Sequence, residues 1–144
     1  MLGLSQLRSI YRWVLPLCLL CSAFPAIAQS TFSLSPGSQV TASGTTAGSM
    51  SLSTIRNRGT QGGFCLGYGN DVPDHTLNLQ GNASRLNLSV DSNGGTTLLV
   101  QAPNGNVYCG GSNLTLSNAS QGSYKIWVGS GDSGQRHRYT LSAK

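Results

Sequence analysis

Short apolar alternations separated by turn residues dominate the chain after residue 28. Leu86, Leu88 and Val90 alternate with polar residues across 85–91, and the segment 75–80 has the same period of two. A period of two is typical of a strand that buries one face. No stretch repeats apolar residues at the spacing of an amphipathic helix. The pattern therefore predicts an all-β chain.

Further strands are predicted between clusters of turn residues. The dense apolar run 96–102 suits a strand buried on both faces, because Asn93-Gly94-Gly95 and Pro103-Asn104-Gly105 turn the chain on either side of it. The remaining strands are expected at 31–34, 49–52, 107–109, 114–116, 124–128 and 139–142, with a flexible loop at 42–48. About 7–9 short strands at this spacing predict an antiparallel β-sandwich with a jelly-roll-like topology.

Residues 1–28 have the pattern of a secretory signal peptide. Arg8 and Arg12 give a basic start, 14–23 is a short apolar run, and Ala26-Ile27-Ala28 is a small-x-small cleavage site. The apolar run is too short to span a bilayer. We therefore expect a secreted or periplasmic protein with one mature domain, residues 29–144, and no stable membrane insertion after cleavage.

Four cysteines divide into two pairs. Cys18 and Cys21 lie in the signal peptide, and each follows leucine where a lipoprotein signal needs a small residue. Cys65 and Cys109 remain, and an exported chain meets an oxidising compartment, so we expect them to form a disulfide. A pair of free thiols is the alternative. A zinc site is disfavoured because no histidine is clustered with these cysteines.

Charge is sparse after residue 28. Seven basic and four acidic residues give a net charge of +3, without the clustered basic footprint of a nucleic-acid-binding protein. Arg136-His137-Arg138 is the densest group of charges. It is interpreted as a solvated loop or strand entry, and the alternative is contact with an anionic glycan or lipopolysaccharide. Arg136 and Arg138 are therefore candidate ligand contacts.

Trp127 and Tyr108 are the other candidate ligand contacts, because they could line a sugar-binding surface. In the strand expected at 124–128, Trp127 lies on the face opposite Tyr124, Ile126 and Val128. If those three residues are buried, Trp127 is exposed, and the reverse arrangement is equally compatible with the sequence. The sequence alone leaves the buried face of this strand open.

Two segments imitate catalytic motifs. Gly131-Asp132-Ser133-Gly134 resembles the nucleophile segment of serine proteases, but neither His75 nor His137 has the context of a catalytic base. We interpret the segment as a hairpin turn. Asp71-Val72-Pro73-Asp74-His75 is interpreted as turn chemistry at a strand entry rather than a metal or acid–base site. We expect no catalytic residues, and we predict that the protein is not an enzyme.

About 80 residues from Cys65 onward resemble the bacterial pre-peptidase C-terminal domain family in the order and spacing of short motifs. The matching segments are Gly63-Phe64-Cys65-Leu66-Gly67-Tyr68, Val72-Pro73-Asp74-His75-Thr76-Leu77, Thr96-Thr97-Leu98-Leu99-Val100, Ala102-Pro103-Asn104-Gly105, Tyr108-Cys109, and Gly122-Ser123-Tyr124-Lys125-Ile126-Trp127-Val128-Gly129. The resemblance implies a jelly-roll-like sandwich in a secreted protein, appended to a protease or standing alone, with a non-catalytic role.

The chain departs from this family where similar domains bind calcium. The loop 110–113 contains no carboxylate, Gly95 stands where an aspartate is often found, and Asp91 alone cannot supply the oxygens that calcium requires. We therefore expect no metal and no cofactor.

Together these features predict a secreted, non-catalytic β-sandwich that serves as a binding or accessory module of the bacterial envelope or extracellular space. Its partner is expected to be another exported protein or an envelope glycan. The alternative is a structural subunit of a surface fibre or matrix, which should offer an unpaired N-terminal donor strand and an open groove.

Overall fold

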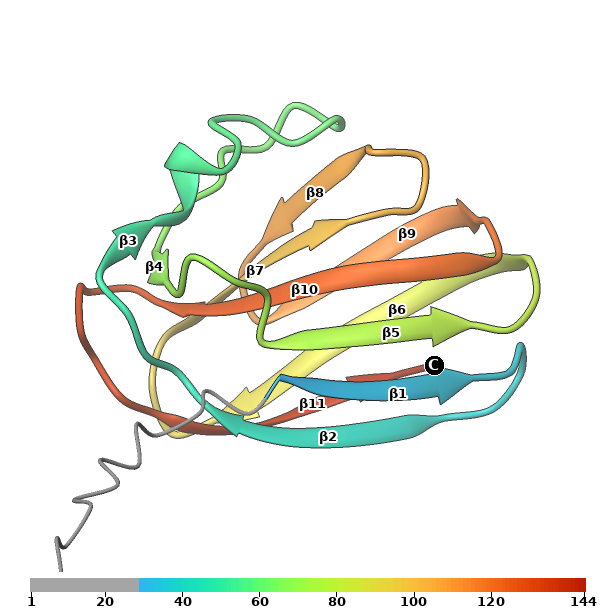
Figure 1. Cartoon of the computed structure of the whole chain (residues 1–144), viewed down its shortest axis with the longest axis horizontal. Helices are drawn as coiled ribbons and strands as arrows, with labels where there is room; N and C mark the ends of the chain where they lie inside the picture. Colours follow the sequence, from blue (N-terminus) through green and yellow to red (C-terminus); the bar gives the residue numbers. More distant parts are fainter. Residues whose placement is uncertain (1–28) are drawn as a thin grey trace, which may run out of the picture.

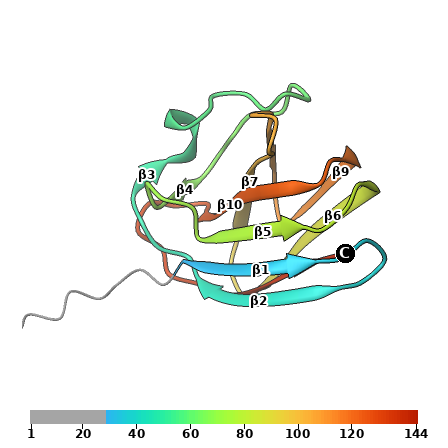
Figure 2. The same ribbon diagram turned by 45° about the vertical axis from the view of Figure 1, so that its right-hand side comes forward.

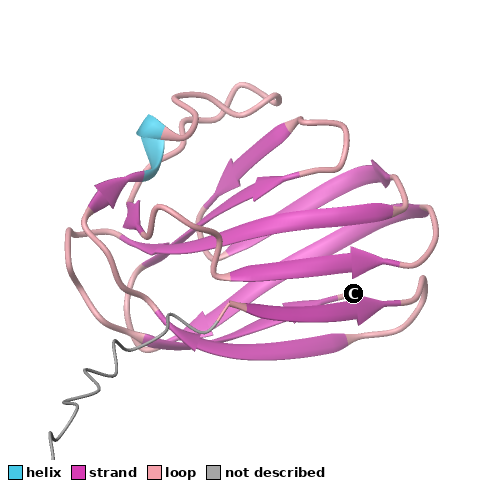
Figure 3. Cartoon of the chain, in the orientation of Figure 1, coloured by secondary structure: helices cyan, strands magenta, loops and turns pink. Residues whose placement is uncertain are grey.

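The computed structural model describes residues 29–144, so the signal peptide expected at 1–28 and its cleavage site lie outside the described residues. Two β-sheets pack face to face, and the only helical element among these residues is the 3-10 turn η1 (Leu52–Thr54) (Figures 1 and 3). The predicted all-β sandwich is confirmed. The eleven strands exceed the expected number because β2 (Val40–Thr45) and the two-residue strand β4 (Tyr68–Gly69) were not predicted.

The larger sheet has seven strands: β1 (Ser30–Leu34), β3 (Met50–Ser51), β4 (Tyr68–Gly69), β5 (His75–Leu79), β7 (Thr96–Gln101), β8 (Val107–Gly110) and β10 (Gly122–Ser130). The long strand β10 organises it, pairing antiparallel with β5 on one side and β7 on the other. The pairing of β1 with β5 is parallel, whereas the other strand pairs of residues 29–144 are antiparallel.

The smaller sheet has four strands in the order β2 (Val40–Thr45), β11 (Arg138–Ala143), β6 (Ala83–Ser92) and β9 (Asn113–Ala119). The flexible loop predicted at 42–48 is wrong over 42–45, since these residues belong to β2 and pair with β11. Apolar alternation is weak here because Ala42 and Gly44 are small. A Cβ on Gly44 would overlap the Tyr139 ring, so glycine leaves room for that side chain.

The seven-stranded sheet buries its inner face and part of its outer face. Tyr124, Ile126 and Val128 point into the core between the sheets, where they pack with inward residues of β6 and β11. Trp127 points the other way and is only 5% exposed, in a second cluster with Leu99. Residues 126–128 are therefore buried on both faces of the strand, an arrangement that differs from either alternative drawn from the sequence, while Lys125 remains exposed. Among residues 29–144 no helix is long and apolar enough to cross a membrane.

Candidate functional site

Residues 52–67, called the cover loop below, connect β3 to β4 and cover the outer face of the seven-stranded sheet around Leu99, Val107 and Trp127. Figure 1 places the loop beside β7 and β8, and Figure 2 shows it outside the two-layer sandwich. Its buried side chains are Leu52 and Cys65, which pack with Leu99, Val107 and Trp127 into the second core cluster. The inner side of the cover loop therefore holds Trp127 away from solvent.

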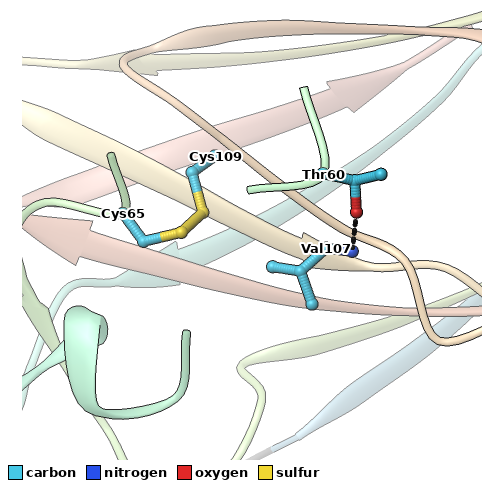
Figure 4. The surroundings of a disulfide bond; sticks show 4 residues. All are labelled: Thr60, Cys65, Val107 and Cys109. Atoms are coloured by element: carbon cyan, nitrogen blue, oxygen red, sulfur yellow. Dashed lines mark hydrogen bonds between the residues drawn. A yellow bond between two sulfur atoms is a disulfide. The ribbon is translucent and has the colours of Figure 1, made fainter. Parts of the chain in front are cut away.

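The cover loop is fastened to β8 at two places (Figure 4). Cys65 and Cys109 form the predicted disulfide. Thr60 forms two hydrogen bonds with Val107 of β8. The Thr60 backbone N–H donates to the Val107 carbonyl at 2.6 Å, and the Val107 N–H donates to Thr60 Oγ1 at 3.1 Å. A Cβ on Gly59 would lie 3.1 Å from the Val107 carbonyl oxygen, so glycine permits this close approach.

Between these attachments the cover loop folds back on itself. Arg58 and Phe64 form an antiparallel bridge, the Gly59 N–H donates to the Gly63 carbonyl at 2.8 Å, and the Cys65 N–H donates to the Asn57 carbonyl at 3.1 Å. These bonds satisfy backbone groups that a loop of this length otherwise leaves to water. The turn is therefore a structured projection rather than a loose connection.

The outer side of the cover loop presents apolar side chains to solvent. Phe64 is 54% exposed and Leu66 is 68% exposed, while Cys65 between them is buried. The Arg58 guanidinium carbon lies 4.0 Å from the centroid of the Phe64 ring, a cation–π contact. We call Arg58, Phe64 and Leu66 the hairpin patch. Arg56 is exposed nearby in sequence, and residues 29–70 contain no carboxylate.

A buried polar cluster, separate from the hairpin patch, links the two sheets by hydrogen bonds. The His75 ring on β5 is 2% exposed, and its Nδ1 lies 2.5 Å from Ser30 Oγ on β1. Its Nε2 lies 2.7 Å from the Tyr139 hydroxyl on β11 of the smaller sheet. Burial lowers the pKa of His75 to about 4 and raises the pKa of Tyr139. The ring is therefore neutral at physiological pH and both of its nitrogens have partners.

The Asp74 carboxylate accepts a hydrogen bond from a backbone N–H of β10. Its Oδ2 accepts a hydrogen bond from the Val128 N–H at 2.9 Å, and its Oδ1 accepts one from Asn70 Nδ2 at 2.9 Å. Burial raises the pKa of Asp74, while these two hydrogen bonds oppose the rise. The segment 71–75 thus contributes hydrogen bonds at the start of β5.

Ser30 and His75 have the composition of a nucleophile and a base. However, Tyr139 occupies the His75 ring nitrogen that a carboxylate would bind in a catalytic triad.

The four candidate ligand residues from the sequence do not form one site. Trp127 is buried beneath the cover loop, so the prediction that it contacts a ligand at the surface is wrong for this folded state. Tyr108 points to the opposite side of its sheet and is partly buried against the main core. Arg136 and Arg138 are exposed, and Arg138 alone lines a surface groove.

The hairpin patch was not anticipated from the sequence, although a signal for it was present. In an extended segment neighbouring side chains point to opposite sides. If the disulfide turns Cys65 inward, Phe64 and Leu66 must point outward.

Within residues 29–144 no cluster of three or more histidine, cysteine or acidic side chains is arranged to hold a metal.

Ser133 should not react with a fluorophosphonate probe. It is exposed in the turn between β10 and β11, and the His137 ring lies against Gly94 of a different turn. A serine hydroxyl needs a base within hydrogen-bond reach to become a strong nucleophile. Mass spectrometry of the treated protein checks this expectation. Stoichiometric labelling at Ser133 that disappears in Ser133→Ala would contradict it.

Comparisons with known proteins identify no family for this chain. No family model and no curated protein matches the chain. Among solved structures, Aeromonas hydrophila PliG, a periplasmic lysozyme inhibitor of g-type lysozyme, has a TM-score of 0.43 and 12% sequence identity, covering 81% of this chain and 98% of that one. A likeness this loose assigns no function.

Proposed function

We propose that this chain is an exported, non-catalytic β-sandwich that binds another exported protein through the hairpin patch. The observation that carries the proposal is the exposure of Phe64 and Leu66 on a loop fixed by a disulfide. Isolated exposed apolar residues are common on protein surfaces. Here two of them flank a buried cysteine beside a stacked arginine, a combination that suits the centre of a protein interface.

The rigidity of the cover loop supports binding. A flexible loop loses conformational entropy when it binds, whereas a loop held by a disulfide and by Thr60–Val107 hydrogen bonds has already lost much of it. Aromatic and arginine side chains are frequent energetic centres of interfaces. Because Phe64 is 54% exposed and Leu66 is 68% exposed, burying the remaining exposed surface against a partner would contribute about 1–2 kcal/mol for each side chain.

An accessory role beside other exported proteins agrees with the resemblance to the pre-peptidase C-terminal domain family, which we retain as part of this proposal. The disulfide suits an oxidising compartment outside the cytoplasm. The fibre-subunit alternative receives no comparable support. Strand β1 is already paired with β5 in the same chain, so residues 30–34 are not free to complete a neighbouring subunit.

Site-specific photocrosslinking tests the proposal. A photoreactive residue at position 64, expressed in the native host, should crosslink one exported protein, and the same residue at the distant exposed position 121 should not. The partner is then purified and titrated against variants of the mature chain. Phe64→Ala and Leu66→Ala should each weaken binding about tenfold or more.

Val72→Ala is the matched control, because Val72 is also an exposed apolar residue (43%) but lies outside the hairpin patch. It should leave the affinity unchanged. Equal losses for Phe64→Ala and Val72→Ala would remove the hairpin patch as the binding site. Crosslinks from position 64 to a second copy of the same chain alone would favour the fibre or matrix role.

A further inference from the structure

The outer face of the four-stranded sheet carries a polar groove that the hairpin patch does not use. Its volume is about 440 Å3, within the range of small-ligand sites. The lining residues are Ser43, Asp91, Ser92, Asn93, Arg138, Tyr139 and Thr140. Unlike the region around Trp127 on the outer face of the seven-stranded sheet, which the cover loop buries, this groove is open to solvent.

Strand register explains how these side chains meet. Thr140 on β11 pairs with Ser43 on β2 and with Asp91 on β6, so the three residues form a row across neighbouring strands. Strands in a sheet lie about 4.8 Å apart, so the row spans about 10 Å. Arg138 lies two residues before Thr140 on the same face of β11. The groove therefore brings one guanidinium, one carboxylate and several hydroxyl groups together.

We propose that this groove binds a carboxylated sugar, such as a uronic acid unit of an anionic glycan. The Arg138 guanidinium would take the sugar carboxylate in a two-point hydrogen-bonded pair. The Asp91 carboxylate and the hydroxyls of Ser43 and Thr140 suit the sugar hydroxyls, because carboxylates only accept hydrogen bonds and hydroxyls both donate and accept. This site is separate from the hairpin patch.

Charge distribution in the groove selects this ligand class over simpler anions. Arg138 and Asp91 lie on adjacent strands, so a ligand with negative charge on all sides would be attracted by one and repelled by the other. A uronic acid carries its charge on one side and neutral hydroxyls elsewhere. It therefore matches both groups, whereas inorganic phosphate matches only the arginine.

Titration with trigalacturonate, followed by amide NMR shifts, tests the proposal on the mature chain. Saturable shifts are expected at Ser43, Asp91 and Thr140. Arg138→Gln should weaken binding about tenfold, and Arg138→Lys should weaken it less because it keeps the charge but loses the planar fork. The fully methyl-esterified trimer, which lacks the charge, should also bind about tenfold more weakly than the acid.

Arg85→Gln is the matched control. Arg85 is an exposed arginine on β6, six residues from Asp91, or about 20 Å along the strand. It removes the same charge and should leave binding unchanged. The proposal is overturned by an absence of saturable shifts at the groove, by equal weakening in Arg85→Gln and Arg138→Gln, or by equal affinity for the acid and its ester. The amide spectrum of each variant shows whether it is folded.

Discussion

Replacing Cys65 with serine should lower the free energy of unfolding by about 4 kcal/mol. The disulfide joins residues 44 apart in the sequence, and the chain-entropy model gives this value for a closed loop of that size. Loss of the bond also releases the cover loop, whose buried side chains shield Trp127. Two effects are therefore expected: a less stable fold and a more exposed indole ring.

Urea unfolding followed by tryptophan fluorescence measures both effects, because Trp127 is the only tryptophan after residue 28. The double variant Cys65→Ser, Cys109→Ser separates the lost bond from the reactivity of a single free thiol and should be destabilised by a similar amount. A loss below about 1 kcal/mol in both variants would show that the Thr60–Val107 hydrogen bonds hold the cover loop without the disulfide.

Lowering the pH from about 6.5 to about 4 should destabilise the fold through His75. Burial lowers its folded-state pKa to about 4, against an ordinary value of 6.5. Between these values the unfolded chain binds a proton that the folded chain does not, so stability falls with falling pH. The contribution is fully present above pH 6.5, is lost by pH 4, and amounts to at most about 3 kcal/mol.

Asp74 acts in the opposite direction, because its folded-state pKa is raised and the folded chain then binds the extra proton. The contribution of His75 is therefore read from a comparison of unfolding free energies at pH 7 and pH 4.5 in the parent chain and in His75→Gln. The variant should be less stable at pH 7, because it loses contacts to Ser30 and Tyr139, but should depend less on pH.

His137→Gln is the control, since that ring lies outside the Ser30–His75–Tyr139 network and the variant should keep the parent pH dependence. If His75→Gln shows the same loss of stability between pH 7 and pH 4.5 as the parent chain, other groups carry the acid sensitivity and the assignment to His75 is wrong.

Alternation predicted the strands whose buried positions hold large apolar residues. Leu86, Leu88 and Val90 of β6 point into the core at the expected period. Strand β2 was missed because its inward positions include Ala42 and Gly44, whose small size is compensated by Tyr139 from the paired strand β11. A single segment cannot reveal a strand when its neighbour supplies the volume that fills the core.

The positions of the candidate site residues depended more strongly than the strand positions on contacts between segments that are distant in the sequence. His75 looked like part of a turn, yet its ring joins Ser30 and Tyr139, which lie far from it in the sequence. For the strand at 124–128 the sequence left open whether Trp127 or the Tyr124, Ile126 and Val128 face is buried, because alternation assigns a strand one buried face. The cover loop, which precedes β10 by more than fifty residues, supplies a second apolar surface and buries Trp127 on the other face.

By itself the sequence determined the all-β class and most strand positions, and it favoured a Cys65–Cys109 disulfide over free thiols, because local alternation, turn residues and cysteine count carry that information. Only the tertiary structure decided that Trp127 is buried, that the exposed Phe64 ring stacks with Arg58, and that Arg138 and Asp91 line one groove. The physical reason is that exposure and proximity depend on which segments pack together, and packing joins residues whose separation along the chain carries no trace of their contact.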